Sequence, residues 1–242
     1  MSNTIIGRNP VIEALKADRE IEKLHICKGT EGSIKKITAM ARDKGIPVYF
    51  EEKLIFDKLA TGNHQGVVAI VSAHRYCDVE DILQLAEQRG EDPFVVILDG
   101  VEDPHNLGAI IRTAEAAGAH GVVIPKRRAV GITETAVKAS AGASEYMLCA
   151  RVSNIAQTID QLKNKGLWIG AADQGGELYY NANLKGAIGL VIGGEGSGVG
   201  KLVREKCDFV VSIAMKGKIN SLNASNAAAI LLYEVQRQRD GR

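Results

Sequence analysis

The stretch LVIGGEGSGVGK, residues 190–201, decides the fold of this chain, because an apolar run leads directly into five closely spaced glycines. Such an apolar run is typical of a strand that is buried on both faces. The loop is not a P-loop, since Glu195 occupies the place of the first glycine and Leu202 that of the hydroxyl residue. It also lacks the dinucleotide-binding fingerprint, because Val199 or Lys201 stands at the third glycine position. Glycines let the backbone approach a flat ligand closely, so we interpret the loop as a cradle that holds Glu195. The alternative is a flexible surface loop.

Strands and helices alternate on both sides of this loop. We predict strands at 94–98, 121–124, 146–149, 167–171, 188–192 and 209–212, and helices at 107–117, 133–141, 155–165, 199–206 and 225–237. This alternation predicts an α/β fold with a mostly parallel sheet and helices on both of its faces. Ligands bind beyond the carboxyl ends of the strands in such sheets, which points to residues 99–106, 193–200 and 214–225.

The beginning of the chain predicts a separate, small α/β domain. Its expected helices lie at 9–16, 33–44 and 54–59, and its expected strands at 23–27, 48–50 and 66–71. Residues 73–92 are more polar and contain one helical stretch around Val79–Glu87, so we interpret them as a linker with an entry helix. The predicted domains are therefore 1–72 and 93–242, joined by the linker 73–92.

Composition narrows the class of protein. The formal net charge is +1, whereas a protein that binds nucleic acid over its whole surface is usually more basic. RNA binding would therefore depend on local patches, of which Lys126-Arg127-Arg128 is the densest and Lys216 with Lys218 a second. A solvated surface turn is the alternative for each of them.

The cysteines and the apolar runs predict a cytoplasmic protein. The four cysteines are far apart and form no CxxC pair, so we expect reduced, mostly buried thiols and no metal site. No run is long and apolar enough to span a bilayer. The first ten residues do not resemble a signal peptide.

A second segment of interest, Asp103–Thr113, follows the predicted strand at 94–98. Asn106 is a candidate N-cap of the next helix, and Arg112 lies six residues further on, among small and apolar residues. Arg112 is a candidate functional side chain. The alternative is an arginine whose stem packs along the helix while its guanidinium reaches solvent.

A third segment, Ile213–Asn226, joins a strand to the closing helix. Asn223 or Ser225 could cap that helix, but capping alone explains only one of the five amide and hydroxyl side chains between Asn220 and Asn226. We expect the backbone of this loop to bind an adenine ring while its side chains face a second ligand.

These three segments resemble the motifs of the SpoU/TrmH family of the SPOUT superfamily, in the right order and spacing across residues 94–238. The first motif is similar to Asn106-x-Gly108-x-x-x-Arg112-Thr113 and the second to Leu190–Gly198. The third is similar to Ile213-x-Met215 followed by Ser221-Leu222-Asn223-x-Ser225. One departure is Ala214, where the family often has proline.

The resemblance implies a catalytic domain with a deep C-terminal trefoil knot, a homodimer and S-adenosylmethionine as cofactor. The N-terminal part, with Gly7–Val11 and Asn63–Ala69, is similar to the L30e-like RNA-binding domain of RlmB-type members, which methylate a guanosine ribose in large-subunit (23S) rRNA. The tRNA-specific members lack this domain, so its presence favours rRNA.

The resemblance also assigns roles to individual residues. The catalytic set implied is Asn106, Arg112, Glu195 and Asn223. The cofactor-binding set implied is Gly193, Gly194, Gly198, Ile213, Met215, Leu222 and Ser225. The RNA-binding candidates are Arg8, Asn9, Asn63, His64, Gln65, Lys126, Arg127 and Arg128. No metal is implied.

The expected reaction is methyl transfer to a ribose 2′-hydroxyl. Arginine is a poor general base, so we expect Arg112 to bind the adjacent phosphate and to stabilise the developing alkoxide. Glu195 could pair with Arg112 and hold its guanidinium in place. The group that accepts the proton stays open. Three alternatives also stay open: a tRNA methyltransferase, an rRNA enzyme that acts on adenosine, and a non-catalytic RNA-binding protein of the same fold.

Overall fold

The computed structural model describes residues 4–17, 19–59, 63–72, 74–196 and 198–241. The chain divides into two compact units, Met1–Arg75 and Tyr76–Arg242. Among the described residues, no helix is both long and apolar enough to cross a membrane.

The first unit has a four-stranded sheet with the order β1-β4-β2-β3. Its elements are β1 (Thr4–Ile6), α1 (Arg8–Lys16), β2 (Ile21–Cys27), α2 (Ile34–Asp43), β3 (Val48–Glu51), α3 (Lys53–Leu59) and β4 (Val67–Val71). Strand β4 pairs antiparallel with β1 and β2, whereas β2 and β3 are parallel. Helices α1 and α2 bury Val11, Leu15 and Ile37 in the core of this unit. The predicted small α/β domain is present, and β1 is a strand that the sequence pattern did not indicate.

The second unit has a six-stranded sheet with the order β10-β8-β9-β5-β6-β7, in which every pairing is parallel. Its strands are β5 (Phe94–Asp99), β6 (Gly121–Pro125), β7 (Leu148–Val152), β8 (Trp168–Leu178), β9 (Ile188–Gly193) and β10 (Phe209–Ser212). Its helices are α4 (Val79–Arg89), α5 (Pro104–Ala116), α6 (Glu134–Ala139), the 3-10 turn η1 (Ala143–Glu145), α7 (Ile155–Asn164), α8 (Lys201–Lys206) and α9 (Ala224–Arg239).

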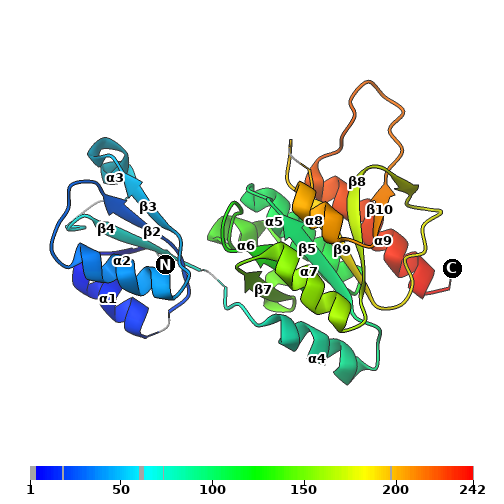
Figure 1. Cartoon of the computed structure of the whole chain (residues 1–242), viewed down its shortest axis with the longest axis horizontal. Coiled ribbons are helices and arrows are strands. Elements are labelled where there is room, and N and C mark those ends of the chain that lie inside the picture. Colours follow the sequence, from blue (N-terminus) through cyan, green and yellow to red (C-terminus); the bar gives the residue numbers. More distant parts are fainter. Residues whose placement is uncertain (1–3, 18, 60–62, 73, 197, 242) are drawn as a thin grey trace. The chain divides into compact units, whose positions relative to one another are not determined.

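Helices cover both faces of this sheet (Figure 1). Alternate residues of β5 enter opposite cores: Val96 packs with the helices α5, α6 and α9, whereas Val95 and Ile97 pack with α4, α7 and α8. Because both faces are buried, the strands read as continuous apolar runs rather than as alternating ones. The predicted α/β architecture is confirmed. The knot that the resemblance implies stays a prediction.

Helix α4 belongs to the second unit, although the sequence analysis placed it in a linker at 73–92. Ile82 is fully buried in the core that α4 shares with α7 and α8. A Cβ on Gly121 would lie 2.4 Å from Ile82 Cδ1, so the helix packs directly on the start of β6. A short amphipathic helix between polar flanks is easily mistaken for a linker when its partner surface is unknown.

The thiols are less buried than expected. All four cysteines are free, but only Cys149 is buried, and the other three are partly exposed. Desolvation raises the pKa of Cys77 to about 11 and that of Cys207 to about 12. These two thiols are therefore protonated at neutral pH.

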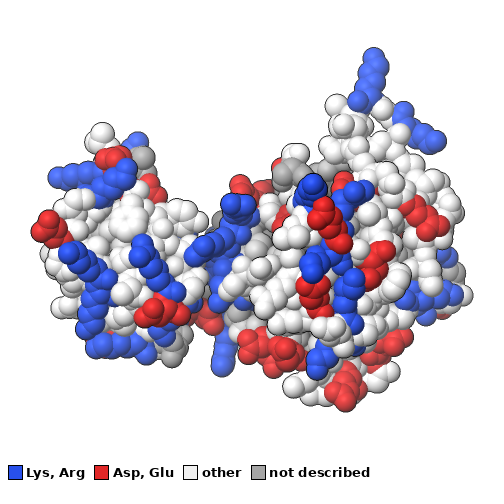
Figure 2. All heavy atoms as spheres, viewed as in Figure 1, with Lys and Arg blue, Asp and Glu red and all other residues white. Residues whose placement is uncertain are grey.

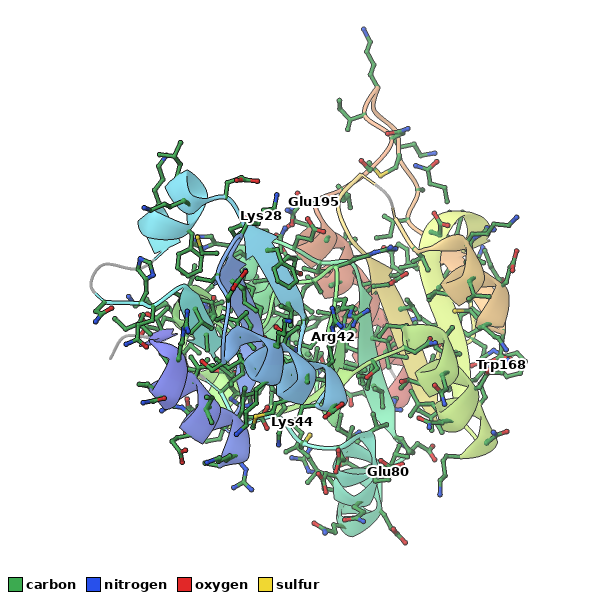
Figure 3. All side chains as sticks on the ribbon, turned by 60° about the vertical axis from the view of Figure 1, so that its left-hand side comes forward. Lys28, Arg42, Lys44, Glu80, Trp168 and Glu195 are labelled. Atoms are coloured by element: carbon green, nitrogen blue, oxygen red, sulfur yellow. The ribbon has the colours of Figure 1, made fainter. Side chains whose placement is uncertain are left out.

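Gly108 allows the close approach of α5 and α6, and this contact gives a first prediction. A Cβ at Gly108 would lie 2.4 Å from the Ala136 carbonyl oxygen and 2.5 Å from Ala139 Cβ. Gly108→Ala should therefore lower the free energy of unfolding by about 1–3 kcal/mol through overpacking. Urea unfolding followed by the fluorescence of Trp168, the only tryptophan, measures this (Figure 3). Gly217→Ala, where a Cβ would lie at an ordinary contact distance of 4.0 Å from Ile219 N, is the matched control. Unchanged or higher stability of Gly108→Ala would contradict the packing argument.

Candidate active site

Three loops meet at the carboxyl edge of the second sheet, as the rule for parallel sheets predicts. They follow β5, β9 and β10, and Figure 3 shows Glu195 at the end of the unit from which the loop after β10 projects. The loops after β9 and β10, together with β8 and α9, surround a cavity of about 540 Å³. Its lining consists of Ala172, Asp173, Gln174, Ile192, Gly193, Gly194, Glu195, Gly196, Gly198, Val211, Ser212, Ile213, Met215, Asn220, Ser221, Leu222, Asn223, Ala224, Ala227 and Leu231.

Asn106 is not the N-cap of α5, contrary to the sequence-based expectation. Asp103 caps the helix, since its side chain accepts a hydrogen bond from His105 N at 3.1 Å, and Pro104 occupies the first helical position. Asn106 therefore lies within the first turn, with only 6% of its surface exposed. Its amide is free for contacts outside the helix.

Asn106, Glu195 and Asn223 form a hydrogen-bonded trio at the cavity. Glu195 Oε1 accepts from Asn106 Nδ2 at 2.9 Å and from Asn223 Nδ2 at 2.6 Å. Asn223 Nδ2 also donates to Asn106 Oδ1 at 3.0 Å. Glu195 and Asn223 lie 89 and 117 residues after Asn106, so the fold rather than local sequence brings the three side chains together. Three of the four predicted catalytic side chains thus share one site.

Asn223 connects this trio to α9. Its Oδ1 accepts from Ser225 N at 3.0 Å, Asn226 N at 3.4 Å and Ser225 Oγ at 2.6 Å, which makes Asn223 the N-cap of the helix. Between Asn223 and Ser225, the two candidates from the sequence, Asn223 is the cap. Because the cap fixes Oδ1 toward the helix, Nδ2 has to face Glu195 and Asn106.

The backbone of the glycine loop packs so closely on neighbouring backbone that a side chain at Gly193 or Gly194 would clash. A Cβ at Gly193 would lie 2.2 Å from the Gly198 carbonyl carbon, and one at Gly194 would lie 2.0 Å from Gly100 O. Gly198 has φ 61°, in the left-handed region that favours glycine. Asp99 Oδ2 accepts from Gly200 N at 2.8 Å and ties the end of the loop to β5. Ser197 of this loop lies outside the described residues.

The predicted cofactor-binding residues mostly line the cavity. Six of them do so: Gly193, Gly194, Gly198, Ile213, Met215 and Leu222. The seventh, Ser225, is not among the lining residues, and its hydroxyl donates to Asn223 Oδ1.

Arg112 lies apart from the trio. Its side chain is exposed, and within the described part of the chain it makes no hydrogen bond or ion pair. The expected pairing of Glu195 with Arg112 is not formed, since Glu195 Oε1 is occupied by the two asparagine amides. The guanidinium of Arg112 is therefore available for an external anion.

Asp173 and Gln174 line the cavity but were missed by the sequence analysis. The sequence predicted a strand that ends at residue 171, before both of them, whereas the observed strand β8 continues to Leu178 and includes them. The signal that could have revealed them is the following pair Gly175-Gly176, because glycines inside a strand mark a bulge.

Within the first unit, Arg8 at the start of α1 and Gln65 in the turn before β4 come together. Arg8 Nε donates to Gln65 O at 3.0 Å, and Arg8 N donates to Gln65 Oε1 at 3.3 Å. His64 Nδ1 accepts from Gly66 N at 3.1 Å, while Asn9 and Asn63 are exposed nearby in the sequence. The structure thus groups Arg8 with the 63–66 loop, as the RNA-binding interpretation requires.

The basic segment Lys126–Arg128 follows β6 at the same sheet edge as the trio. Arg127 and Arg128 are exposed, and Lys126 is partly buried. Val130 N donates to Val101 O at 3.0 Å, which fixes this segment against the loop that leads to Asn106. Basic and acidic side chains are otherwise mixed on the visible surface (Figure 2), in keeping with the near-neutral net charge.

The cavity fits the S-adenosylmethionine that the motif resemblance implies. Ile192, Val211 and Leu231 offer apolar walls for a flat ring, and the glycine loop offers backbone groups that a Cβ would obstruct. Among the described residues, no group of three or more His, Cys, Asp or Glu side chains could hold a metal ion.

Comparison with known families covers both units. Residues 93–233 match the model of the SpoU rRNA Methylase family. Residues 4–77 match a model described as RNA 2'-O ribose methyltransferase substrate binding. The two matched segments agree with the two units, except that α4 of the second unit lies between the segments and is matched by neither model.

Known proteins similar to this chain match it over nearly its whole length. YacO of Bacillus subtilis (strain 168), named as a TrmH family tRNA/rRNA methyltransferase, is 48% identical over 98% of this chain and 96% of its own. The structure of the SpoU methyltransferase AviRb from Streptomyces viridochromogenes, in complex with AdoMet, has a TM-score of 0.63 at 25% identity and covers 99% of this chain and 91% of its own. An AdoMet-bound rRNA methyltransferase from Sinorhizobium meliloti has a TM-score of 0.60 at 26% identity, over 97% and 87%. The chain therefore belongs to the SpoU rRNA methylase family and is an S-adenosylmethionine-dependent RNA methyltransferase.

Proposed function

We propose that this enzyme methylates the ribose 2′-hydroxyl of a guanosine in large-subunit rRNA. The observation that carries the proposal is the trio Asn106–Glu195–Asn223, of which Glu195 and Asn223 line the cofactor cavity and Asn106 binds both. Support for the position of the methyl group comes from the substrate-binding family model, whose description specifies 2'-O ribose methyltransferases. Support for rRNA comes from the similarity of both units together to an rRNA methyltransferase.

The trio would orient the ribose. Glu195 Oε1 already accepts two hydrogen bonds, whereas Oε2 has no partner among the described residues and can accept one from a ribose hydroxyl. S-adenosylmethionine, when bound, supplies an electrophilic methyl group on a positively charged sulfur. The trio therefore has to hold the hydroxyl oxygen in line with that group, and its fixed hydrogen bonds reduce the freedom lost on reaction.

Arg112 would contact the RNA backbone beside the reacting ribose. Its exposed guanidinium can bind a phosphate with two parallel hydrogen bonds. A guanidinium stays protonated, so it would stabilise the alkoxide that develops on the 2′-oxygen rather than remove the proton.

A homodimer would complete the site around Arg112. Two large aromatic side chains are exposed on elements that pack beside α5. Tyr146, which follows η1, is 80% exposed, and Tyr233 of α9 is 50% exposed. Large exposed aromatic groups around one helix are typical of an interface. We therefore propose that the α5 side faces a second copy, with Arg112 close to the RNA bound there.

The basic segment at 126–128 would bind RNA phosphates, and this gives a second prediction. Replacing Lys126, Arg127 and Arg128 by alanine should weaken RNA binding and reduce the dependence of affinity on salt, because each lost phosphate contact removes about 0.7–0.9 from the log–log slope. Fluorescence anisotropy with an rRNA fragment at several salt concentrations measures both. Cofactor affinity is the internal control. An unchanged slope would identify the segment as an ordinary solvated turn.

The first unit would recognise the RNA away from the reacting ribose. Its match to a substrate-binding model and its grouping of Arg8 with the 63–66 loop support this assignment. The similar protein YacO is named for both tRNA and rRNA, so a tRNA substrate is the alternative.

Mapping of 2′-O-methyl groups in a deletion strain tests the proposal. We expect one ribose methyl group to disappear from a guanosine of large-subunit rRNA and to return with the wild-type gene but not with Arg112→Ala. A methyl group lost from tRNA would establish the alternative substrate. Unchanged rRNA and tRNA would contradict a role in ribose methylation.

A further inference from the structure

Strand β8 contains a bulge that faces the cofactor cavity. Ala171 pairs with Val210 of β10, but the next residue of β10, Val211, pairs with Glu177, so residues 172–176 have no partner in β10. Two glycines permit this path: Gly175 has φ 77°, and a Cβ at Gly176 would lie 2.3 Å from Val210 O. The bulge turns Asp173 and Gln174 toward the cavity that they line.

The bulge is bonded to both loops that form the cavity. Asp173 Oδ2 forms an ion pair with Arg204 Nε of α8 at 3.0 Å, and α8 directly follows the glycine loop. Asp173 Oδ1 accepts from Gln174 N at 2.7 Å, which fixes the start of the Gln174 side chain. Gln174 Nε2 donates to Asn220 O at 2.7 Å. Residues far apart in sequence are thus held together by two adjacent side chains.

The loop at 214–222 depends on this one hydrogen bond. Every residue in it is exposed, and within the described part of the chain its single hydrogen bond is the one from Gln174 to Asn220. Figure 1 shows this loop, between β10 and α9, projecting beyond the rest of the second unit. Yet Met215, Asn220 and Leu222 belong to the cavity wall. Because one hydrogen bond holds this loop, binding of a molecule against it requires the loop to become ordered.

We propose that Gln174 is a positioning residue that pre-organises the 214–222 loop for S-adenosylmethionine. The proposal rests on the cofactor assignment of this cavity. An amide side chain supplies what the position needs, because it donates to a carbonyl and carries no charge toward the sulfonium group or the RNA. Binding to a loop that is already held in place costs less conformational entropy, so Gln174 raises cofactor affinity without touching the reacting atoms.

Calorimetry with S-adenosylmethionine on the full-length protein tests this role. Gln174→Ala should raise the dissociation constant about 3- to 10-fold, the range expected for one net hydrogen bond. The rate of methyl transfer at saturating cofactor should stay near wild type. In the absence of cofactor, trypsin should cleave after Lys216 and Lys218 several-fold faster than in the wild type, since the loop has lost its tether.

Gln174→Glu adds a readout that a merely structural role would not move. A carboxylate cannot donate to Asn220 O, whereas a protonated carboxyl can. The affinity of this variant relative to wild type should therefore be low at pH 8 and recover toward pH 5. Gln161→Glu, at an exposed position on α7, is the matched control and should show no such recovery.

The proposal would be overturned if the Gln174 variants matched the wild type in cofactor affinity, in trypsin sensitivity and in the pH dependence of affinity. If the wild-type protein itself bound no S-adenosylmethionine, the assignment of the cavity to this cofactor would be wrong, and the proposed role of Gln174 would be wrong as well. Thermal unfolding of each variant should match that of the wild type, because Gln174 is exposed.

Discussion

Arg112→Ala is expected to reduce methyl transfer about 100- to 1,000-fold while cofactor affinity stays near that of the wild type. A positioned charge at a developing oxyanion typically contributes this much to the rate. Arg112 lies on α5 and does not line the cofactor cavity, whose walls come from β8, α9 and the loops after β9 and β10. Its exposed side chain makes no contact within the described residues, so its loss leaves no described group unpaired.

The measurement is single-turnover methyl transfer at saturating cofactor, with folding checked separately. Arg112→Lys should not restore the rate, because an ammonium group cannot bind phosphate and hydroxyl together as a planar guanidinium does. Arg89→Ala is the matched control, since Arg89 is also an exposed helical arginine of the second unit. A folded Arg112→Ala protein that keeps more than about a tenth of the wild-type rate would show that Arg112 is an ordinary surface residue.

Asn223→Asp is expected to reduce the rate about 100-fold or more without destabilising α9. Aspartate caps helices as well as asparagine does, so the bonds from Ser225 N and Asn226 N remain. The other oxygen, however, would replace an N–H donor that lies 2.6 Å from Glu195 Oε1 and 3.0 Å from Asn106 Oδ1. Two carboxylates at that distance repel each other, and the trio cannot keep its geometry.

The Asn223→Asp defect should be pH-dependent. A proton shared between the two carboxylates restores one hydrogen bond, so the rate relative to wild type should rise as the pH falls. Asn154→Asp is the matched control, because Asn154 caps α7 through Gln157 N at 3.2 Å and lies outside the cavity lining. A rate near that of the wild type would mean that Asn223 serves only as a helix cap.

Most of the fold could be predicted because its signals are local. The apolar runs at 94–98 and 188–192 became central strands β5 and β9, and the glycine loop follows β9 as expected. The sequence offered Asn223 both as a cap and as a site residue; its Oδ1 caps α9, while its Nδ2 donates to Glu195 at the cavity.

The misplaced features depend on contacts between distant segments. The sequence offered Asn106 as the N-cap of α5, but Asp103 caps the helix by accepting from His105 N. The side chain of Asn106 instead donates to Glu195, which lies 89 residues later in the chain. The continuation of β8 beyond residue 171 depends on its pairing with β10, in which Glu177 pairs with Val211 and Leu178 with Ser212. Gln174 donates to a backbone carbonyl 46 residues away, a contact that no sequence pattern records.

The location of the transferred methyl group tests the central claim most directly. The full-length protein is incubated with rRNA and tRNA from a strain that lacks it, together with methyl-labelled S-adenosylmethionine, and the RNA is then digested to nucleosides. We predict that the label appears in 2′-O-methylguanosine from large-subunit rRNA, and that Arg112→Ala and Asn223→Asp transfer at least about 100-fold less in a single turnover. Label on a nucleobase, or no transfer to either RNA by a folded protein that binds the cofactor, would contradict a ribose methyltransferase site built on Asn106, Glu195 and Asn223.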